Sequence, residues 1–481
     1  MRDVAMNGAH QRTTLAGLTI LLAALAGCAN LTAPSSDEVY DKAMHGIAVP
    51  AAWSAAADAG AFRPEWIGFA DDAGLKALID EALAHNPDLR VAATRLEQVR
   101  LQMRLAGADL LPNVVFGAKY SDSLQPANGL DINGFGVALS WEIDLWGRAR
   151  AEKKAGEATY RSAEADYVFA RQSLVATTIE AWMLCIQATR QTALAEQQTR
   201  AALDQVQLVS HREAVGRASR QDVEIAKANA QTLEDSASQA EQARQQALRT
   251  LELIAGRYPS ATIVVPDVLP GTLDPVPAGV PSDLVERRPD LVAARERYEA
   301  AFFGREEARA ARLPRLALNA GAGYLTSDYV QFKEGLDKTV FPIGGKLLWP
   351  LFDQGRLATA VDIADQQQQE AAANYAKTIL VAFGEVENAL SADATLQRRV
   401  RARSAQVEAL RAAVSAAEEQ SRVGKNDQYN VLDQELALRS AEAALLRVLV
   451  EQRTQRVNLY LALGGDFGTN ARAPADEPRS P

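Results

Sequence analysis

The residue whose surroundings most clearly predict chemistry is Cys28. Arg2 and Arg12 precede an apolar run of 11 residues at 15–25, and Leu-Ala-Gly at 25–27 leads into the cysteine. The run is shorter than the roughly 20 residues that a membrane-spanning helix needs, but it fits the core of a signal peptide. Small residues directly before a cysteine form the bacterial lipobox, in which the cysteine becomes the acylated first residue. We therefore expect a lipoprotein signal peptide at 1–27 and a covalent lipid on Cys28.

The alternative for this segment is an ordinary secretory signal with an incidental cysteine. The next residue is Ala29, not the aspartate that favours retention in the inner membrane, so the pattern favours the bacterial outer membrane. The second cysteine, Cys185, lies in an apolar helical stretch. We expect it to be a small packed side chain.

The remaining candidates for catalysis or metal binding do not combine into a site. The histidines, at 10, 45, 85 and 211, lie in unrelated segments, and the methionines, at 1, 6, 44, 103 and 183, do not cluster. No metal-ligand spacing and no phosphate-binding glycine loop occurs. The net charge of −10 disfavours a nucleic-acid partner. We expect no enzyme, no bound metal and no cofactor besides the covalent lipid.

The elements that must position any functional residue occur twice. The Pro-Asp-Leu step at Pro87 recurs at Pro289, an offset of 202 residues (289 − 87). Farther along, Gly147-Arg148 recurs as Gly355-Arg356, an offset of 208 (355 − 147). The second copy therefore carries six extra residues between these landmarks. A repeat of this length is a duplicated half-protein rather than a solenoid unit.

The repeat divides the chain into segments. We predict a signal peptide at 1–27, a lipid-anchored extended tail at 28–70, a first repeat at 71–258, a proline-rich linker at 259–280, a second repeat at 281–465 and a flexible C-terminal tail at 466–481.

Each repeat contains a long segment without proline. No proline occurs between Arg148 and Tyr258 or between Leu351 and Ala473, and Gly216 and Gly424 interrupt these segments. We predict helical hairpins at about 148–257 and 356–464. The 69 residues from Gly147 to Gly216 (216 − 147) would make one arm about 100 Å long.

The apolar residues of the hairpins have coiled-coil spacing. The predicted seam of the second hairpin comprises Val400, Val407, Leu410, Val414 and Ala417 on one arm and Leu436, Ala443, Val450 and Val457 on the other. Such narrow seams suit helices that pack side by side while one surface stays wet. A simple two-helix coiled coil in bulk water is the alternative.

The segments before the hairpins alternate as strands do. Apolar residues alternate with small or polar ones at about 112–144 and 314–352, two strands per repeat. This alternation is typical of outer-membrane barrels, and a half-buried soluble sheet is the alternative. No segment after the signal has 18 uninterrupted apolar residues, so we expect any membrane crossing to use a closed barrel. Four strands cannot close one. Two chains would supply eight strands and a barrel filled by side chains, and three chains would supply 12 strands around a water-filled lumen, which a pore would favour.

The repeated order of strand pair, Trp141-x5-Gly147-Arg148 and proline-free hairpin resembles the TolC-like outer membrane efflux proteins. The lipobox resembles their lipoprotein (NodT-type) branch. This resemblance implies a mainly α fold with membrane β: a homotrimeric 12-stranded β-barrel, four strands per chain, continued by a long periplasmic α-helical barrel. It also implies a periplasmic adaptor and an inner-membrane pump of the resistance-nodulation-division type as partners.

The resemblance also assigns residues. The hairpin tips that would meet the adaptor are Val215, Gly216, Val423 and Gly424, and the pore constriction would comprise Tyr429, Asp433 and Asp222. By the 208-residue offset Asp222 matches Asn430 and not Asp433, so the two repeats do not supply equivalent acids. Three copies of Asp433 around a threefold axis would favour cations; a solvated hairpin residue is the alternative.

Together these patterns predict the passive outer membrane channel of a tripartite efflux system for drugs or other toxic small molecules. The alternative is a periplasmic coiled-coil scaffold or adaptor lipoprotein without a pore.

Overall fold

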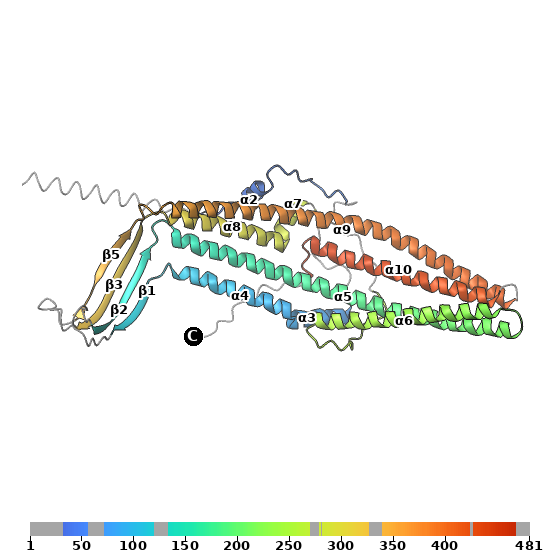
Figure 1. Ribbon diagram of the computed structural model, residues 1–481. Coiled ribbons are helices and arrows are strands. Elements are labelled where there is room, and N and C mark those ends of the chain that lie inside the picture. Colours follow the sequence, from blue (N-terminus) through green and yellow to red (C-terminus); the bar gives the residue numbers. More distant parts are fainter. Residues whose placement is uncertain are drawn as a thin grey trace, which may run out of the picture. The chain divides into compact units, whose positions relative to one another are not determined.

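The computed structural model of the chain describes residues 32–55, 72–119, 133–269, 279, 281–326, 339–423 and 427–467. The chain is mostly helical, as predicted (Figure 1). Its elements are α2 (Ser36–Ala43), α3 (Ala73–His85), α4 (Pro87–Ala108), β1 (Asn113–Lys119), β2 (Asn133–Ile143), α5 (Arg148–Ala214), α6 (Arg220–Ile254), α7 (Pro281–Arg287), α8 (Pro289–Ala310), β3 (Arg315–Thr326), β4 (Thr339–Val340), β5 (Ile343–Leu348), α9 (Arg356–Arg422) and α10 (Gln428–Ala462).

The helices come in pairs of equal length. α5 and α9 have 67 residues each, α6 and α10 have 35 each, and α4 and α8 have 22 each. The longest two begin directly after Gly147 and Gly355, whose φ angles are +82° and +83°. Glycine adopts such angles without the steric cost that a side chain would add. These glycines therefore set where each long helix starts.

Asn86 separates the two helices that open the first repeat. Its side-chain oxygen accepts a hydrogen bond from the Leu89 N–H at 2.9 Å, and its amide nitrogen donates to the Ile254 carbonyl at 2.9 Å. Pro87 follows at the first position of α4, where a missing N–H costs nothing. Asn86 and Pro87 together therefore separate α3 from α4.

The chain divides into two compact units. One contains residues up to Ile47, Arg95–Glu164 and Ala293–Lys377, and the other contains Ala48–Thr94, Ala165–Val292 and the chain from Thr378 onward. In the first unit, Arg161 on α5 donates to Glu296 and Glu299 on α8 at 2.7 and 2.8 Å.

The second unit holds an extensive hydrophobic core. α3, α5, α6 and α10 meet there around fully buried Met183, Ile186 and Leu251. Trp182 packs in this core and donates from its Nε1 to Asp72 at 3.0 Å. Cys185 is also buried there, and burial raises the pKa of its thiol to about 12. The prediction that Cys185 is a packed side chain is confirmed.

The strands form one antiparallel sheet in the order β1, β2, β3, with β4 and β5 both paired to β3 (Figure 1). β4 and β5 are pieces of one strand, interrupted at Phe341-Pro342, because proline has no N–H for the ladder. The predicted continuation of this strand to Leu351 is wrong. β5 ends at Leu348, and Pro350 lies just beyond it.

The prediction of an extended tail over 28–70 is wrong for residues 36–43, which form α2. A capping box starts this helix: the Glu38 N–H donates to the Ser35 hydroxyl at 3.3 Å, and the Ser35 N–H donates to the Glu38 carboxylate at 3.0 Å. Lys42 on α2 donates to the Tyr298 hydroxyl at 3.2 Å. Ser-x-x-Glu is a helix-start signal that could have been read from the sequence.

The segment after α2 is also attached. Trp53 is buried and meets Phe383 edge-on, with 5.7 Å between ring centroids. The Glu387 carboxylate accepts bonds from the Ser54 and Ala55 N–H groups at 2.7 and 2.9 Å. These contacts hold residues 53–55 against α9.

Part of the predicted seam in α10 is wrong. Val450 and Val457 are buried, but Leu436 and Ala443 are only half-buried. Near the tip the cluster is instead Val407, Val414, Leu438 and Ala441. A straight helix drifts about 20° per heptad from a strict seven-residue repeat, so steps of seven from Val457 leave the seam.

Among the described helices, none combines the length and the apolarity needed to cross a bilayer.

Candidate functional site

The tip of the first hairpin is closed by its own residues. α5 ends at Ala214, and Gly216 follows with a φ of +74°. The Arg217 N–H donates to the Arg212 carbonyl at 2.7 Å and the Gly216 N–H to the Glu213 carbonyl at 2.9 Å. This is the glycine-dependent end that helices commonly use.

The start of α6 completes this tip. The Asp222 carboxylate accepts bonds from the N–H and the hydroxyl of Ser219, both at 2.8 Å, and the Ser219 hydroxyl accepts from the Asp222 N–H at 3.2 Å. The Ser219 backbone N–H, followed by its hydroxyl, lowers the pKa of Asp222. Asp222 thus has a capping role that accounts for its carboxylate.

The tip of the second hairpin is built differently. α9 ends at Arg422, and α10 begins after Asp427, whose carboxylate accepts from the Tyr429 N–H at 2.9 Å. The guanidinium of Arg212, from the other hairpin, also pairs with Asp427. This ion pair, followed by the weaker effect of the Tyr429 N–H, lowers the pKa of Asp427 against the opposing effect of burial. The sequence analysis did not identify this pair between the tips.

The predicted tip residues that the structure describes are exposed. Val215 and Val423 each expose 68% of their surface, and Gly216 is exposed as well. Two apolar side chains at equivalent tip positions, both in solvent, suit contact with a partner. Gly424 and Cys28 lie outside the described residues.

Two of the three predicted constriction residues, Tyr429 and Asp433, lie on the first two turns of α10. Tyr429 exposes 43% of its surface, and Asp433, four residues later, is also exposed. Residues four apart share one helix face, so the phenol and the carboxylate project on the same side. Asp222 lies on a different helix, in its own cap. The structure therefore groups Tyr429 with Asp433 and leaves Asp222 apart from them.

A further acid near this tip escaped the sequence analysis. Burial raises the pKa of Glu435 on α10, and the charges of Glu418 on α9 and Asp204 on α5 raise it further. These three carboxylates come from three helices separated in sequence, so no local pattern could have grouped them. Among the residues that the structure describes, no group of histidine, cysteine and carboxylate side chains could hold a metal ion.

The sheet has two chemically distinct faces. Residues directly opposite each other on antiparallel strands share a face, and the register pairs Val137 with Ala322 and Trp141 with Leu318. On this face the side chains are apolar almost throughout: Val114, Phe116, Ala118, Phe135, Val137, Leu139, Trp141, Ile143, Leu316, Leu318, Ala320, Ala322, Tyr324, Ile343 and Leu347. Many of them are exposed, including Phe116 at 68% and Ile343 at 86%.

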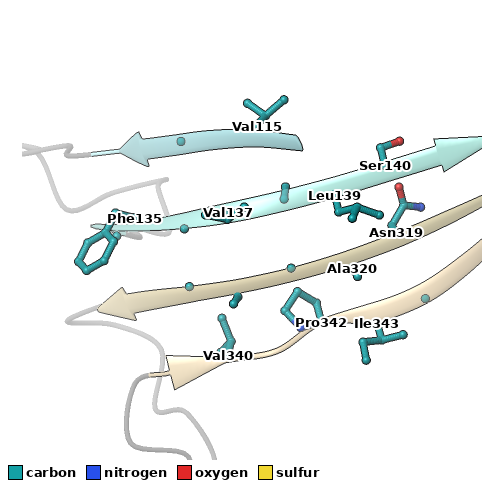
Figure 2. A pocket seen from close by; sticks show the side chains of 18 of the residues that line it. Val115, Phe135, Val137, Leu139, Ser140, Asn319, Ala320, Val340, Pro342 and Ile343 are labelled. Atoms are coloured by element: carbon teal, nitrogen blue, oxygen red, sulfur yellow. The ribbon is translucent and has the colours of Figure 1, made fainter. Parts of the chain in front are cut away.

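The opposite face carries mainly small or polar residues, with apolar exceptions at Val115, Val340 and Leu348. Ser140 pairs with Asn319 across β2 and β3, as Figure 2 shows. Gly117, Gly136 and Gly323 stand opposite one another on three strands. A Cβ on Gly136 would lie 2.8 Å from the Ala322 carbonyl oxygen, so only glycine permits this approach. Glycines at such positions allow a sheet to bend sharply.

A comparison with known families identifies the architecture. The family model described as outer membrane efflux protein matches residues 78–257 and 280–465. These two segments contain the sheet and both hairpins.

Individual relatives match along most of the chain. It is 32% identical over 421 residues to the antibiotic efflux pump outer membrane protein ArpC of Pseudomonas putida, which covers 85% of this chain and 87% of that protein. It is 30% identical over 466 residues to the outer membrane protein OprJ of Pseudomonas aeruginosa, covering 94% and 96%.

Among solved structures, the open state of the outer membrane channel MtrE of Neisseria gonorrhoeae superimposes with a TM-score of 0.77 at 27% identity. The match covers 87% of this chain and 96% of that chain.

Proposed function

The chain belongs to the outer membrane efflux protein family, and we propose that three copies of it form a passive duct for small toxic molecules. Its role is that of the outer membrane channel of an efflux pump. The observation that carries the proposed duct is the sheet with one apolar, exposed face and one small, polar face.

This sheet suits a bilayer. β2 has 11 residues and β3 has 12, so a strand of this sheet is about 37 Å long. Tilted by about 40°, it would rise about 28 Å, close to the thickness of the hydrocarbon core. The exposed apolar face would meet lipid and the polar face would meet water. A soluble scaffold would instead leave that apolar face in water.

The edges of the sheet argue for assembly. β1 and the β4–β5 strand each have one side without a partner strand among the described residues. In lipid every unpaired backbone group costs several kcal/mol. Because four strands alternate in direction, β5 of one chain can pair antiparallel with β1 of the next. Three chains would then close 12 strands around a water-filled lumen.

The two repeats would contribute equivalent hairpins. The equal lengths of α5 and α9 and of α6 and α10 support six similar hairpins in a trimer, arranged as a periplasmic helical barrel. The exposed Val215 and Val423 at the tips would meet a periplasmic adaptor, which connects the duct to an energised inner-membrane pump. Tyr429 and Asp433 would narrow the entrance.

The lipid anchor completes the proposal. Acylation of Cys28 would hold the N-terminal segment at the outer membrane. Mass spectrometry of the mature protein should find an acylated N-terminus at Cys28, whereas an intact Met1 terminus would contradict it.

The membrane role can be tested with substitutions on the two sheet faces. Val137→Arg places a charge on the apolar face, where it should cost roughly 2–4 kcal/mol per site near the bilayer centre, so the protein should disappear from the outer membrane fraction. The matched control is Ser140→Arg, three residues away on the polar face, which should assemble normally.

The assembly can be counted directly. Native mass spectrometry of the detergent-extracted protein should give three chains, and planar bilayers should show conductance. Equal tolerance of both arginine variants, or a stable monomer, would contradict the duct.

A further inference from the structure

The polar face of the sheet is not neutral. Of its charged side chains, three are cationic, Lys119, Arg315 and Lys346, and one is anionic, Glu142; all four lie on the described strands and share a face by register. The rest of this face is mainly glycine, alanine, serine and asparagine. The excess of positive charge on this face contrasts with the negative charge of Asp433, which is exposed near the hairpin tip.

The anionic side chain on this face is already paired. The Glu142 carboxylate accepts a hydrogen bond from Arg148 Nε at 3.1 Å. Glu142 lies opposite Ala317, which lies opposite Lys346, so the backbones of Glu142 and Lys346 are two strand spacings apart, about 10 Å. That distance equals a Debye length at about 0.1 M salt, and Glu142 therefore does little to neutralise Lys346.

Lys119 and Lys346 are both exposed, and neither forms a hydrogen bond or ion pair with any residue that the structure describes. Arg315 differs, because its guanidinium lies close enough to Glu307 on α8 to act on that carboxyl. Among the described residues, the unpaired positive charge of this face thus lies mainly on Lys119 and Lys346.

The lysines stand at two heights on the sheet. Lys119 pairs with Gly134, and the row containing Lys346 crosses β2 at Glu142. Eight residues of β2 (142 − 134) separate these rows, about 27 Å along the strand. Near Lys119 the glycines leave a hollow of about 720 Å3, bordered by Gly117, Gly134 and Gly136 (Figure 2). A solute could therefore approach the ammonium group closely.

We propose that this face forms an anion-attracting exit wall, in which Lys119 and Lys346 draw negatively charged solutes into the strand section of the duct. The inference rests on the proposed function, since it needs the polar face to line a lumen. In a trimer each lysine would form a ring of three charges at its own height. The duct would then have opposite preferences at its two ends, with acid at the hairpin entrance and ammonium groups at the exit.

A polyvalent anion added on the side of the bilayer where the strand section opens would meet Lys119 and Lys346 before it reaches the hairpin tips, so its block of the current reports on the lysines. Purified trimers in planar bilayers at about 0.1 M salt, where the lysine fields extend about 10 Å, would receive inositol hexakisphosphate on that side. We expect wild-type current to be blocked, and Lys119→Gln/Lys346→Gln to require a concentration at least about tenfold higher, because rings of charge govern ion entry into channels.

Two matched variants separate charge from other effects. Lys119→Arg/Lys346→Arg should retain the block, because it keeps the charges. Lys76→Gln removes an exposed lysine on α3, outside the sheet, and should leave the block unchanged. A conducting trimer whose block is the same in wild type and in the double glutamine variant would overturn the exit wall alone. If no trimeric pore formed at all, the proposed function would fail and the inference with it.

Discussion

The two hairpin tips have similar ends and different beginnings. Both place an exposed valine where the long helix stops, Val215 in the first and Val423 in the second. The first tip then restarts through a capping box contained within residues 219–222. The second restarts at Asp427, which caps α10 and also pairs with Arg212 of the first hairpin. The cap of the first tip thus uses only residues of that tip, whereas the cap residue of the second tip also pairs with the first hairpin.

This difference separates the two acids that the sequence suggested for the constriction. The Asp222 carboxylate accepts a hydrogen bond from Ser219, whereas Asp433 is exposed one turn beyond Tyr429. The first tip therefore has an acid that caps a helix, and the second has an exposed acid with no hydrogen bond or ion pair to any described residue. This difference predicts unequal consequences when matching positions are altered.

The largest effect is expected at the turn of the first tip. Gly216→Pro forces φ from +74° to about −65° and removes the N–H that donates to Glu213. The tip should lose its shape, and efflux should fall to the level of a deletion strain in susceptibility assays, while trimers remain intact. Gly216→Asn is the control, since asparagine tolerates positive φ.

The same substitution at Gly424 sharpens the comparison. If both tips dock a partner, Gly424→Pro should abolish efflux equally. Full efflux by either proline variant would remove that tip from the docking surface.

The next effect concerns the exposed acid, Asp433. Asp433→Ala should raise single-channel conductance and lower cation selectivity, because a ring of three carboxylates would be lost. Asp222→Ala should leave both unchanged and instead speed amide hydrogen exchange in the first turn of α6. A conductance change in Asp222→Ala equal to that in Asp433→Ala would erase the distinction between the tips.

The smallest effect is expected from the pair between the tips. Arg212→Ala should destabilise the start of α10 by about 0.2–1 kcal/mol, the range of partly exposed ion pairs. The pKa of Asp427 is lowered in the folded chain. The pair therefore contributes stability above the ordinary aspartate pKa, and this contribution is lost as pH falls through the folded value.

Hydrogen exchange at residues 428–432 of wild type and Arg212→Ala measures this pair. The two proteins should differ at neutral pH and converge in acid. A difference that persisted undiminished at low pH would mean that Asp427 does not carry the effect.

Much of the fold follows from local signals in the sequence. Helix starts at Gly147 and Gly355 and the break at Asn86-Pro87 depend on conformations that single residues impose. The strands likewise follow from a two-residue alternation of apolar with small or polar residues. The register, which pairs Val137 with Ala322 on one face, confirms this alternation. Such signals do not need long-range contacts to be recognised.

The misses came from long-range packing and from one overlooked cap. The Arg212–Asp427 pair joins residues 215 apart in sequence, and no spacing rule links them. Leu436 and Ala443 were assigned to the seam by a rigid seven-residue step, which helix geometry does not maintain. α2 was missed although Ser35 and Glu38 carried its start signal. The roles of Tyr429, Asp433 and the tip residues remain predictions, tested by the variants above.

The docking of α2 has a consequence for how far the chain can reach. Seven residue-to-residue steps lead from Cys28 to Ser35 (35 − 28), and a fully stretched chain of that length covers at most about 25 Å. Arg295 and Tyr298 on α8 hold α2 through Ser36 and Lys42. If Cys28 carries a lipid, the bilayer surface must lie within about 25 Å of the start of α2, which is itself bound to α8. The N-terminal segment would then limit the position of the protein along the membrane normal.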